Sequence, residues 1–414
     1  MMTGQPEHVI IVGAGLGGLR AAQQLRSVGF QGRISLVGAE RHPPYDRPPL
    51  SKQLLTLGWD PERIVLAGLD ALDEIGVRAH LGLPAVALRP GGGVGRPAHE
   101  LELADGSTLH GDAIVVATGL TARKLPGQPD EMLTLRTLED ALALRDTLGR
   151  VGSLLIVGGG FIGAEVASCA TGEGLPVTML EAMPVPFGRA LGPELGALAA
   201  RNFSAGVDLR TGVTITGFTG VPDGVGVELA DGTVVRAEAG LVGVGGVPCI
   251  DWLPPEVVER VAAGGLHCSP TGRVHGLRGV WAVGDVSAWD DPEHGVPHRH
   301  EHWTSAGDQA AAVAHDILGA PPPPPAVPYF WSDQFGLKIQ VIGRPELADA
   351  DHVMPLHGTG LDGGDVRGTV AGYLEGERLV AVAGFGAARY VSRYRPLVAA
   401  GATADEAKAL AASL

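Results

Sequence analysis

The chain has 414 residues, a length that suggests two or three domains, each able to bury a hydrophobic core. Its 31 Lys and Arg residues against 46 Asp and Glu residues give a formal net charge of −15, which argues against a nucleic-acid binder or a polybasic membrane binder. Gly and Pro are abundant, at 63 and 31 residues, but a hydrophobic content of 45% excludes a chain that is disordered throughout.

From His8, the segment HVIIVGAGLGGLRAAQQL reads as a strand, a glycine turn with the spacing Gly13-x-Gly15-x-x-Gly18, and a helix. Glycines at this spacing permit a tight turn and let the backbone approach a pyrophosphate at the helix N-terminus. The next apolar strand ends at Glu40, whose carboxylate could accept hydrogen bonds from ribose hydroxyls. The three glycines alone could be a simple turn, but with strand, helix and acid they predict a dinucleotide site.

The same pattern recurs once. LLIVGGGFIGAEVASCA carries Gly158-x-Gly160-x-x-Gly163, and the strand that follows ends at Glu181. We therefore expect a second dinucleotide site. Glu181 favours NADH over NADPH, because a carboxylate repels a 2′-phosphate and no Lys or Arg lies between Glu181 and Gly188. The alternative is that Glu181 is a solvated acid at the end of a strand.

Each half of the repeat also contains an Asp-Gly hairpin signal, at Asp105-Gly106 and at Asp231-Gly232. The later segment GVWAVGDVSA is expected to close the sheet that the first unit opens, so the second unit is inserted into the first. Five prolines, Pro321–Pro325, form a semi-rigid spacer before a third part of short apolar strands and a terminal helix. The sequence thus predicts an α/β protein with two Rossmann-like domains and a smaller C-terminal domain.

Five further motifs carry a family resemblance: PYDRPPLSK (Pro44–Lys52), ATGLTARKLPG, VWAVGDV, EHW and PYFWSDQ. With the expected helix LRTLEDALALRD (Leu135–Asp146), they resemble the FAD- and NADH-dependent ferredoxin reductases of oxygenase systems, the family of putidaredoxin reductase. The resemblance implies a glutathione-reductase-like fold. It assigns residues 1–118 and 248–326 to an FAD-binding domain, 119–247 to an NAD-binding domain, and 327–414 to a C-terminal α+β interface domain.

The resemblance also implies roles for individual residues. Glu40 would bind the adenosine ribose of FAD, and Arg47 would approach its phosphates. Asp285 would bind a ribityl hydroxyl or a phosphate, although an Asp that caps the following turn is an alternative. The remaining FAD-binding candidates are Thr118, Gly119, Arg123 and Trp303.

Lys52 is expected near flavin N5, where a fixed ammonium would stabilise the reduced flavin and orient the nicotinamide. Glu165 would pair with this lysine on the nicotinamide side. The alternatives are a surface lysine and a glutamate favoured at a helix start by the helix dipole. Trp331 would flank the isoalloxazine from the third domain, or pack as an ordinary interface aromatic.

His298, His300 and His302, with His294 nearby, alternate and could share one face of a strand, so we weighed a metal site. No cysteine and no second cluster supports one, and the segment aligns with the family's EHW stretch. We therefore expect no metal, and Trp303 with the helix after it as flavin neighbours.

The three cysteines, Cys169, Cys249 and Cys268, lie far apart without a CxxC spacing, which excludes a disulfide framework and a cysteine-based zinc site. No cysteine precedes Cys169 in the sequence. Cys169 itself lies in an apolar predicted helix and is therefore expected to be a core residue. We therefore expect electrons to leave directly from flavin, without thiol chemistry. The family often has Asn where Cys249 stands, so the contact made there is open.

The expected function is transfer of hydride from NADH to FAD, then of single electrons to a small iron–sulfur ferredoxin that serves a cytochrome P450 or a Rieske oxygenase. The alternatives are a rubredoxin, quinone or oxygen reductase, or a redox sensor resembling apoptosis-inducing factor. Candidates for ferredoxin docking are Arg389, Arg393 and Arg395, although a solvated helix face would look the same. The N-terminus has no basic region before its apolar strand and no apolar run reaches the roughly 18 residues of a bilayer span, so we expect a cytoplasmic protein without a membrane anchor.

Overall fold

The structure is a computed structural model that describes residues 5–56, 59–91, 98–221, 224–349 and 353–414. Its contacts divide the described residues into two compact units. The first lobe comprises Met1–Asp46, Glu62–Thr121 and Gly246–Ala326, and the second lobe comprises Arg47–Pro61, Ala122–Gly245 and Val327–Leu414. The middle segment of the second lobe therefore lies, in sequence, between two segments of the first, as the predicted insertion requires.

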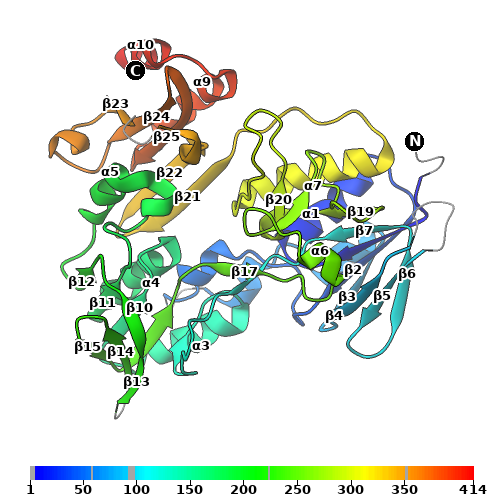
Figure 1. Ribbon diagram of the computed structural model, residues 1–414, viewed down its shortest axis with the longest axis horizontal. Helices are drawn as coiled ribbons and strands as arrows, with labels where there is room; N and C mark the ends of the chain where they lie inside the picture. Colours follow the sequence, from blue (N-terminus) through cyan, green and yellow to red (C-terminus); the bar gives the residue numbers. More distant parts are fainter. Residues whose placement is uncertain (1–4, 57–58, 92–97, 222–223, 350–352) are drawn as a thin grey trace. The chain divides into compact units, whose positions relative to one another are not determined.

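A five-stranded parallel sheet forms the centre of the first lobe, with the order β19-β7-β1-β2-β3. Its strands are β1 (His8–Val12), β2 (Arg33–Gly38), β3 (Val77–Leu81), β7 (Ala113–Val116) and β19 (Val280–Ala282). Helices α1 (Leu16–Ser27) and α7 (Trp303–Leu318) pack side by side on this sheet (Figure 1). Because β19 pairs in parallel with β7, the predicted closure of the sheet is confirmed.

The other elements of the first lobe cover the second face of this sheet or connect its strands. The Asp105-Gly106 hairpin is confirmed: it joins β5 and β6 of the antiparallel sheet β4-β5-β6, and Gly106 has a φ of +83°. The remaining bounds are β4 (Ala85–Arg89), β5 (His99–Leu103), β6 (Thr108–Gly111), β8 (Leu120–Ala122), β17 (Gly246–Pro248), β18 (Leu266–Cys268), β20 (Ser287–Trp289), α2 (Leu69–Glu74), α6 (Pro255–Val258), η2 (Pro61–Ile64) and η3 (Gly284–Val286).

The second lobe repeats this architecture with a parallel sheet of order β12-β11-β10-β16-β9. Its strands are β9 (Met132–Leu133), β10 (Leu154–Val157), β11 (Val177–Leu180), β12 (Val207–Arg210) and β16 (Ala239–Val242), and its helices are α3 (Leu138–Leu148), α4 (Phe161–Gly172) and α5 (Gly188–Ala200). The predicted helix at Leu135–Asp146 begins later than expected, because Thr137 and Asp140 form a capping box. A second antiparallel sheet joins β13 (Ile215–Val221), β14 (Gly224–Leu229) and β15 (Val234–Ala237).

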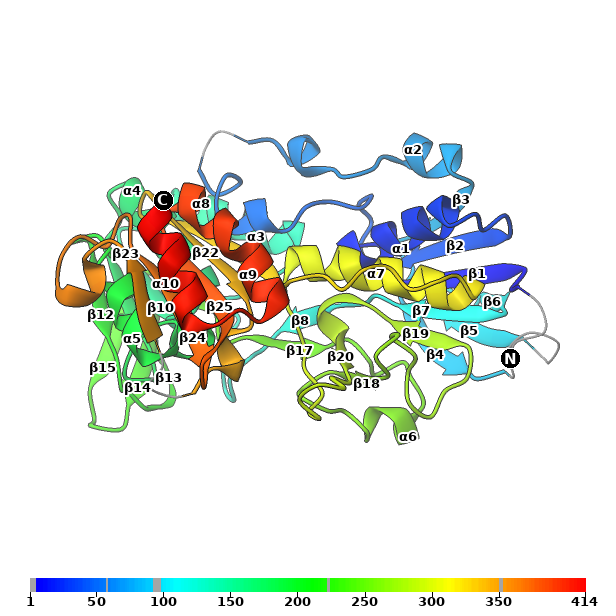
Figure 2. The same ribbon diagram turned by 90° about the horizontal axis from the view of Figure 1, so that it is seen from above.

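The C-terminal segment of the second lobe is an antiparallel sheet of order β21-β22-β25-β24-β23, with helices packed on one side (Figure 2). Its elements are β21 (Tyr329–Gln334), β22 (Leu337–Gly343), β23 (Val353–His357), β24 (Val370–Glu375), β25 (Arg378–Phe385), α8 (Ala388–Val391), α9 (Arg395–Ala400) and α10 (Ala404–Ser413), together with the short helices η4 (Pro345–Leu347), η5 (Gly360–Asp362) and η6 (Ser392–Tyr394). A further short helix of the lobe, η1 (Pro48–Ser51), comes much earlier in the sequence.

The predicted fold class is confirmed: two Rossmann-like units, the second inserted in the first, and a C-terminal α+β part. The exact domain boundaries stay predictions. None of the helices in the described ranges combines the length and the apolar character that a bilayer crossing demands.

Candidate functional site

The three glycines of the first glycine turn have different structural roles. Gly13 has a φ of +118°, and a Cβ there would overlap the carbonyl oxygen of Ala117. A Cβ on Gly18 would overlap the carbonyl oxygen of Gly13, so this glycine lets α1 pack closely on the turn. Gly15 is different, because no described atom lies within 4 Å of a Cβ built there and Gly15 is the N-cap of α1. The turn therefore leaves open space in front of the helix N-terminus, as a bound pyrophosphate requires.

The second glycine turn has the same construction. Gly158 has a φ of +109°, and its Cβ would overlap the carbonyl oxygen of Gly243. A Cβ on Gly163 would overlap the carbonyl oxygen of Gly158, and Gly160, the N-cap of α4, again has open space within the described structure. Two turns with the same division of roles fit two dinucleotide cradles.

The first-lobe candidates meet at one edge of the parallel sheet. Glu40 follows β2, Thr118 and Gly119 follow β7, and Asp285 follows β19, so all lie at the carboxyl ends of strands, where the turn after β1 also lies. The strand order reverses between β1 and β7, and ligands of such sheets bind in the crevice at this reversal.

Hydrogen bonds within the first lobe hold these residues. Glu40 accepts a hydrogen bond from the hydroxyl of Tyr45. The Thr118 hydroxyl donates to the carbonyl of Cys249 over 2.7 Å, and the Cys249 N–H donates to the carbonyl of Gly119 over 3.1 Å. Because these two hydrogen bonds use the backbone of Cys249, the departure from the family's Asn leaves this connection intact.

Trp303 is the first residue of α7, as expected. Its indole Nε1 donates to the Asp46 carboxylate over 2.7 Å, and the Arg20 guanidinium lies 5.6 Å from the ring centroid. The first turn of α7 contains no acidic residue of its own. The hydrogen bond to Asp46 and the contact with Arg20 hold the Trp303 ring in place.

The alternating histidines do not share a strand face, the arrangement that would have favoured a metal site. The segment 298–302 is irregular, apart from one bridge between Trp289 and His298. The rings of His298 and His300 still lie 4.3 Å apart, and those of His300 and His302 lie 5.6 Å apart. Proximity here comes from a folded loop, because the following helix begins only at Trp303.

In the second lobe, backbone groups fix the Glu181 carboxylate at the end of β11. The Gly159 N–H donates to Oε2 over 2.6 Å, and the Met183 N–H donates to Oε1 over 2.7 Å. Gly159 belongs to the second glycine turn. The carboxylate is thus held beside the open helix N-terminus, in the position where a ribose diol could use its remaining lone pairs.

Lys52 and Glu165 form the predicted ion pair. Lys52 Nζ lies 2.8 Å from Glu165 Oε2, and the two side chains are 12% and 4% exposed. Glu165 also accepts hydrogen bonds from the hydroxyls of Ser51 and Ser332, the latter to Oε1 over 2.6 Å. A carboxylate with an ammonium and two hydroxyl donors is well satisfied despite its burial. Sequence reasoning missed both serines, because nothing local marks Ser332, 167 positions from Glu165, as its partner.

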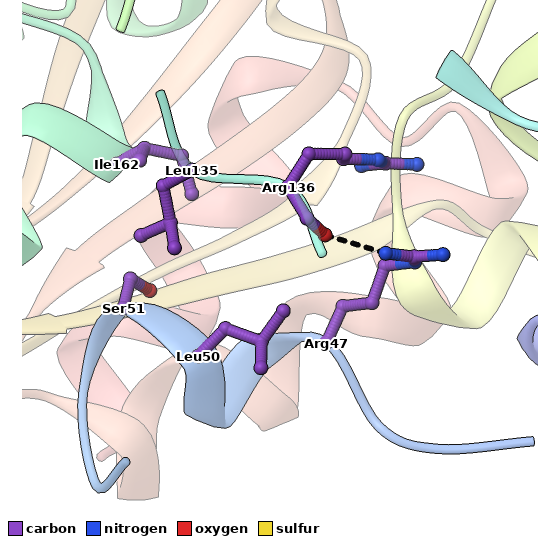
Figure 3. A pocket seen from close by; sticks show the side chains of 6 residues that line it. All are labelled: Arg47, Leu50, Ser51, Leu135, Arg136 and Ile162. Atoms are coloured by element: carbon purple, nitrogen blue, oxygen red, sulfur yellow. Dashed lines mark hydrogen bonds between the residues drawn. The ribbon is translucent and has the colours of Figure 1, made fainter. Parts of the chain in front are cut away.

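A small pocket of about 50 Å³ lies beside this cluster (Figure 3). It has room for a few water molecules. Arg47 belongs to its wall and donates a hydrogen bond to the Arg136 carbonyl. The lining residues are Arg47, Leu50, Ser51, Leu135, Arg136 and Ile162.

The other second-lobe candidates are placed as follows. The Arg123 N–H donates to the Gly245 carbonyl over 2.9 Å. Trp331 precedes Ser332 on β21, so the two side chains point to opposite faces of that strand, and the Trp331 ring stacks on Tyr329 at 5.8 Å. Because Arg47 and Arg123 belong to the second lobe, their predicted contact with an FAD held by the first stays a prediction.

All three cysteines, each within the described residues, are free thiols. Burial, with the nearby Glu165 carboxylate, raises the pKa of Cys169 to about 11. Burial also raises the pKa of Cys268. A thiol with a raised pKa is protonated near neutral pH and is a poor nucleophile, so Cys169 and Cys268 are unsuited to thiol chemistry.

These two lobes define a reductase with paired dinucleotide cradles, and the family comparison agrees. Residues 7–310 match the family described as pyridine nucleotide-disulphide oxidoreductase, and residues 329–414 match the reductase C-terminal family. The chain belongs to the pyridine nucleotide-disulphide oxidoreductase family. Membership implies the use of a flavin and of NAD(P)H.

Similar proteins narrow the class further. The ferredoxin–NAD(+) reductase subunit of the benzene 1,2-dioxygenase system of Pseudomonas putida is 38% identical over 350 residues, covering 82% of this chain and 81% of that one. A ferredoxin–NAD(P)(+) reductase of Sphingomonas sp. is 33% identical and covers 92% of this chain and 94% of its own. The crystal structure of the covalent putidaredoxin reductase–putidaredoxin complex has a TM-score of 0.85 at 28% identity, covering 95% of this chain and 93% of that chain.

Proposed function

We propose that this chain passes hydride from NADH to FAD and then single electrons to a small ferredoxin, which serves a cytochrome P450 or a Rieske oxygenase, in the cytoplasm. The observation that carries the proposal is the buried Lys52–Glu165 ion pair. Glu165 lies in the first turns of α4, the helix that the second glycine turn opens. The pair therefore lies beside the proposed nicotinamide cradle and adds a charged group that dinucleotide binding alone does not need.

The first lobe offers the residues to hold FAD. Gly13 and Gly18 shape the turn, and Gly15 leaves the N-terminus of α1 open to a pyrophosphate. Glu40 would accept hydrogen bonds from the ribose hydroxyls, and Asp285 would accept from the ribityl chain. When bound, FAD supplies the ability to accept two electrons together and to release them one at a time.

The second lobe offers a cradle suited to NADH. Glu181 has both carboxylate oxygens fixed by backbone N–H groups, so the carboxylate cannot swing away from a ribose placed at the open end of α4. The nearest cation on the next strand, Arg210, pairs with Asp208 at 2.7 Å, which reduces its availability to a 2′-phosphate. These features favour an unphosphorylated ribose.

Lys52 and Glu165 would act together. Ser51 and Ser332 hold Glu165 in one orientation, and Glu165 in turn fixes the Lys52 ammonium. A fixed ammonium stabilises negative charge that develops nearby without reorganising at the moment of reaction. Ser51 and Ser332 are therefore positioning residues, and Lys52 is the group proposed to meet the reacting atoms.

The ferredoxin partner is suggested by the similar proteins, two of which are named as ferredoxin reductases. Because this chain is strongly negative overall, docking an acidic ferredoxin requires a local basic surface. The three candidate arginines on and between α8 and α9 are exposed. They are Arg389, Arg393 and Arg395.

Anaerobic stopped-flow reduction tests the proposal. Purified holoprotein is mixed with NADH or with NADPH, and the flavin absorbance is followed. In a second mix, an oxidised ferredoxin is added to the reduced protein, and reoxidation of the flavin is recorded. The expected result is fast bleaching by NADH, slower bleaching by NADPH, and rapid reoxidation by the ferredoxin. A long-lived charge-transfer complex that the ferredoxin does not discharge would contradict the proposal and support the redox-sensor alternative.

A further inference from the structure

A group of metal-ligating side chains lies in the first lobe away from the proposed cofactor residues. His267 is on β18, His275 follows in the loop after it, and Asp290 comes directly after β20. Among the described residues, these three form the group of His, Cys, Asp or Glu whose ligand atoms all lie within 4.8 Å of one another. The sequence did not indicate this group, because its members are 8 and 15 positions apart.

Both histidines of the group direct a ring nitrogen at the Asp290 carboxylate. His267 Nε2 lies 2.7 Å from Asp290 Oδ1, and His275 Nε2 lies 2.8 Å from Asp290 Oδ2. The two imidazole rings are 4.3 Å apart. Both rings therefore aim the same nitrogen at one carboxylate, which leaves two nitrogens and two oxygens facing a common point.

The backbone fixes this arrangement. His267 stands between Leu266 and Cys268, which are both completely buried, so its side chain is directed outward from the core. The Asp290 N–H donates to the Cys268 carbonyl over 2.7 Å, and the His275 N–H donates to the His267 carbonyl over 3.0 Å. The three ligands are thus attached to one hydrogen-bonded patch of backbone.

We propose that His267, His275 and Asp290 form a binding site for one divalent cation of the zinc class, which ties β18, the loop after it and the end of β20 together. Two imidazoles and one carboxylate are the ligands of many three-residue zinc sites, in which the fourth position is open to water. Imidazole nitrogens also select against Mg²⁺ and Ca²⁺, which prefer oxygen ligands.

Binding requires only a small adjustment. Ligands about 2.0–2.1 Å from a tetrahedral Zn²⁺ are roughly 3.3 Å apart, so atoms already within 4.8 Å reach the ion by small side-chain rotations. Each neutral imidazole can carry its proton on Nδ1 and present Nε2 to the ion. The site is half exposed, with His267 and His275 side chains 30% and 42% accessible, so an ion can enter from solvent.

Isothermal titration with ZnCl₂ tests the site on chelator-treated holoprotein. The wild-type protein should bind one Zn²⁺ per chain, and His267→Ala, His275→Ala and Asp290→Asn should each weaken binding by about tenfold or more, since losing even an indirect support of a metal site costs that much. His110→Ala, an exposed histidine on β6, is the matched control and should bind as the wild type does.

Thermal unfolding provides a second readout that does not depend on the flavin reaction. Zn²⁺ should raise the unfolding temperature of the wild type and of His110→Ala, and should leave that of His275→Ala unchanged. The absence of saturable Zn²⁺ binding would overturn the proposal. Binding that survives in His267→Ala and is lost in His300→Ala would also overturn it, because it would place the ion in the histidine loop before α7.

Discussion

The Lys52–Glu165 pair yields the sharpest prediction, because its geometry sets the size of the effect. At 2.8 Å and an effective dielectric constant of about 20, the gross attraction of the two charges is about 6 kcal/mol. Desolvation of two almost fully buried side chains offsets several kcal/mol of this attraction. Removal of one partner leaves the other charge buried without its counter-ion.

Lys52→Met should therefore slow flavin reduction by NADH about 10²–10³-fold, the usual cost of losing one preorganised electrostatic group at a reacting centre. Glu165→Gln should slow it less, because Ser51 and Ser332 still hold the side chain and the ammonium remains. The assay is anaerobic stopped-flow bleaching of the flavin at saturating NADH. Lys408→Met, a 60% exposed lysine on α10, is the matched control and should react as the wild type does.

The double variant completes a double-mutant cycle, which measures how far the effects of Lys52 and Glu165 depend on each other. If the two residues act as one unit, Lys52→Met combined with Glu165→Gln should be little slower than Lys52→Met alone, with a coupling energy of about 1–3 kcal/mol. The reasoning would be refuted if the fold-decreases of the two single variants multiplied in the double variant. It would also be refuted if the flavin of Lys52→Met were reduced as fast as that of the wild type.

Three more predictions concern the nucleotide, a thiol and the partner. Glu181→Gln should narrow the preference for NADH over NADPH, since it removes the charge that repels a 2′-phosphate; kcat/KM with both nucleotides measures this, and an unchanged ratio would contradict the assignment. Cys169, with its pKa raised to about 11, should resist alkylation by iodoacetamide at pH 8, because only the thiolate reacts, and its labelling should rise only as pH approaches that value; prompt labelling at pH 8 would show a normal pKa. Arg393→Glu should slow ferredoxin reduction at low salt and leave the reduction of the flavin by NADH unchanged. The difference from the wild type should vanish at high salt. A rate that does not depend on salt would contradict the assignment of the arginines to the docking surface.

Local sequence patterns were enough to predict the repeated dinucleotide-binding units. The glycine turns at Gly13 and Gly158, the Asp-Gly hairpins and the strand-end acids each depend on residues close in sequence. Thr118 and Asp285 were assigned by the family resemblance, and the parallel sheet explains their position, because it brings the carboxyl ends of its strands to the edge where the first turn lies.

The parts that could not be predicted depend on contacts between distant segments. Ser332 meets Glu165 only because β21 packs against α4, and a serine carries no periodic or compositional signal for such a contact. The alternation of the histidines near residue 300 is compatible with a strand, but the backbone there forms an irregular loop, so alternation alone does not settle the local structure. The cluster at Asp290 arises from the parallel pairing of β18 with β20, which neither strand encodes alone.

Flavin content tests the central claim most directly, since every assignment assumes that the first lobe binds FAD. Purified protein is titrated with FAD after removal of bound nucleotide, and its visible absorbance and flavin fluorescence are recorded for the wild type and for Gly13→Val, whose side chain would occupy the space of the Ala117 carbonyl. The account predicts one FAD per chain, bleached by NADH, in the wild type and much weaker binding in the variant. A wild-type protein that remains colourless after reconstitution would contradict it.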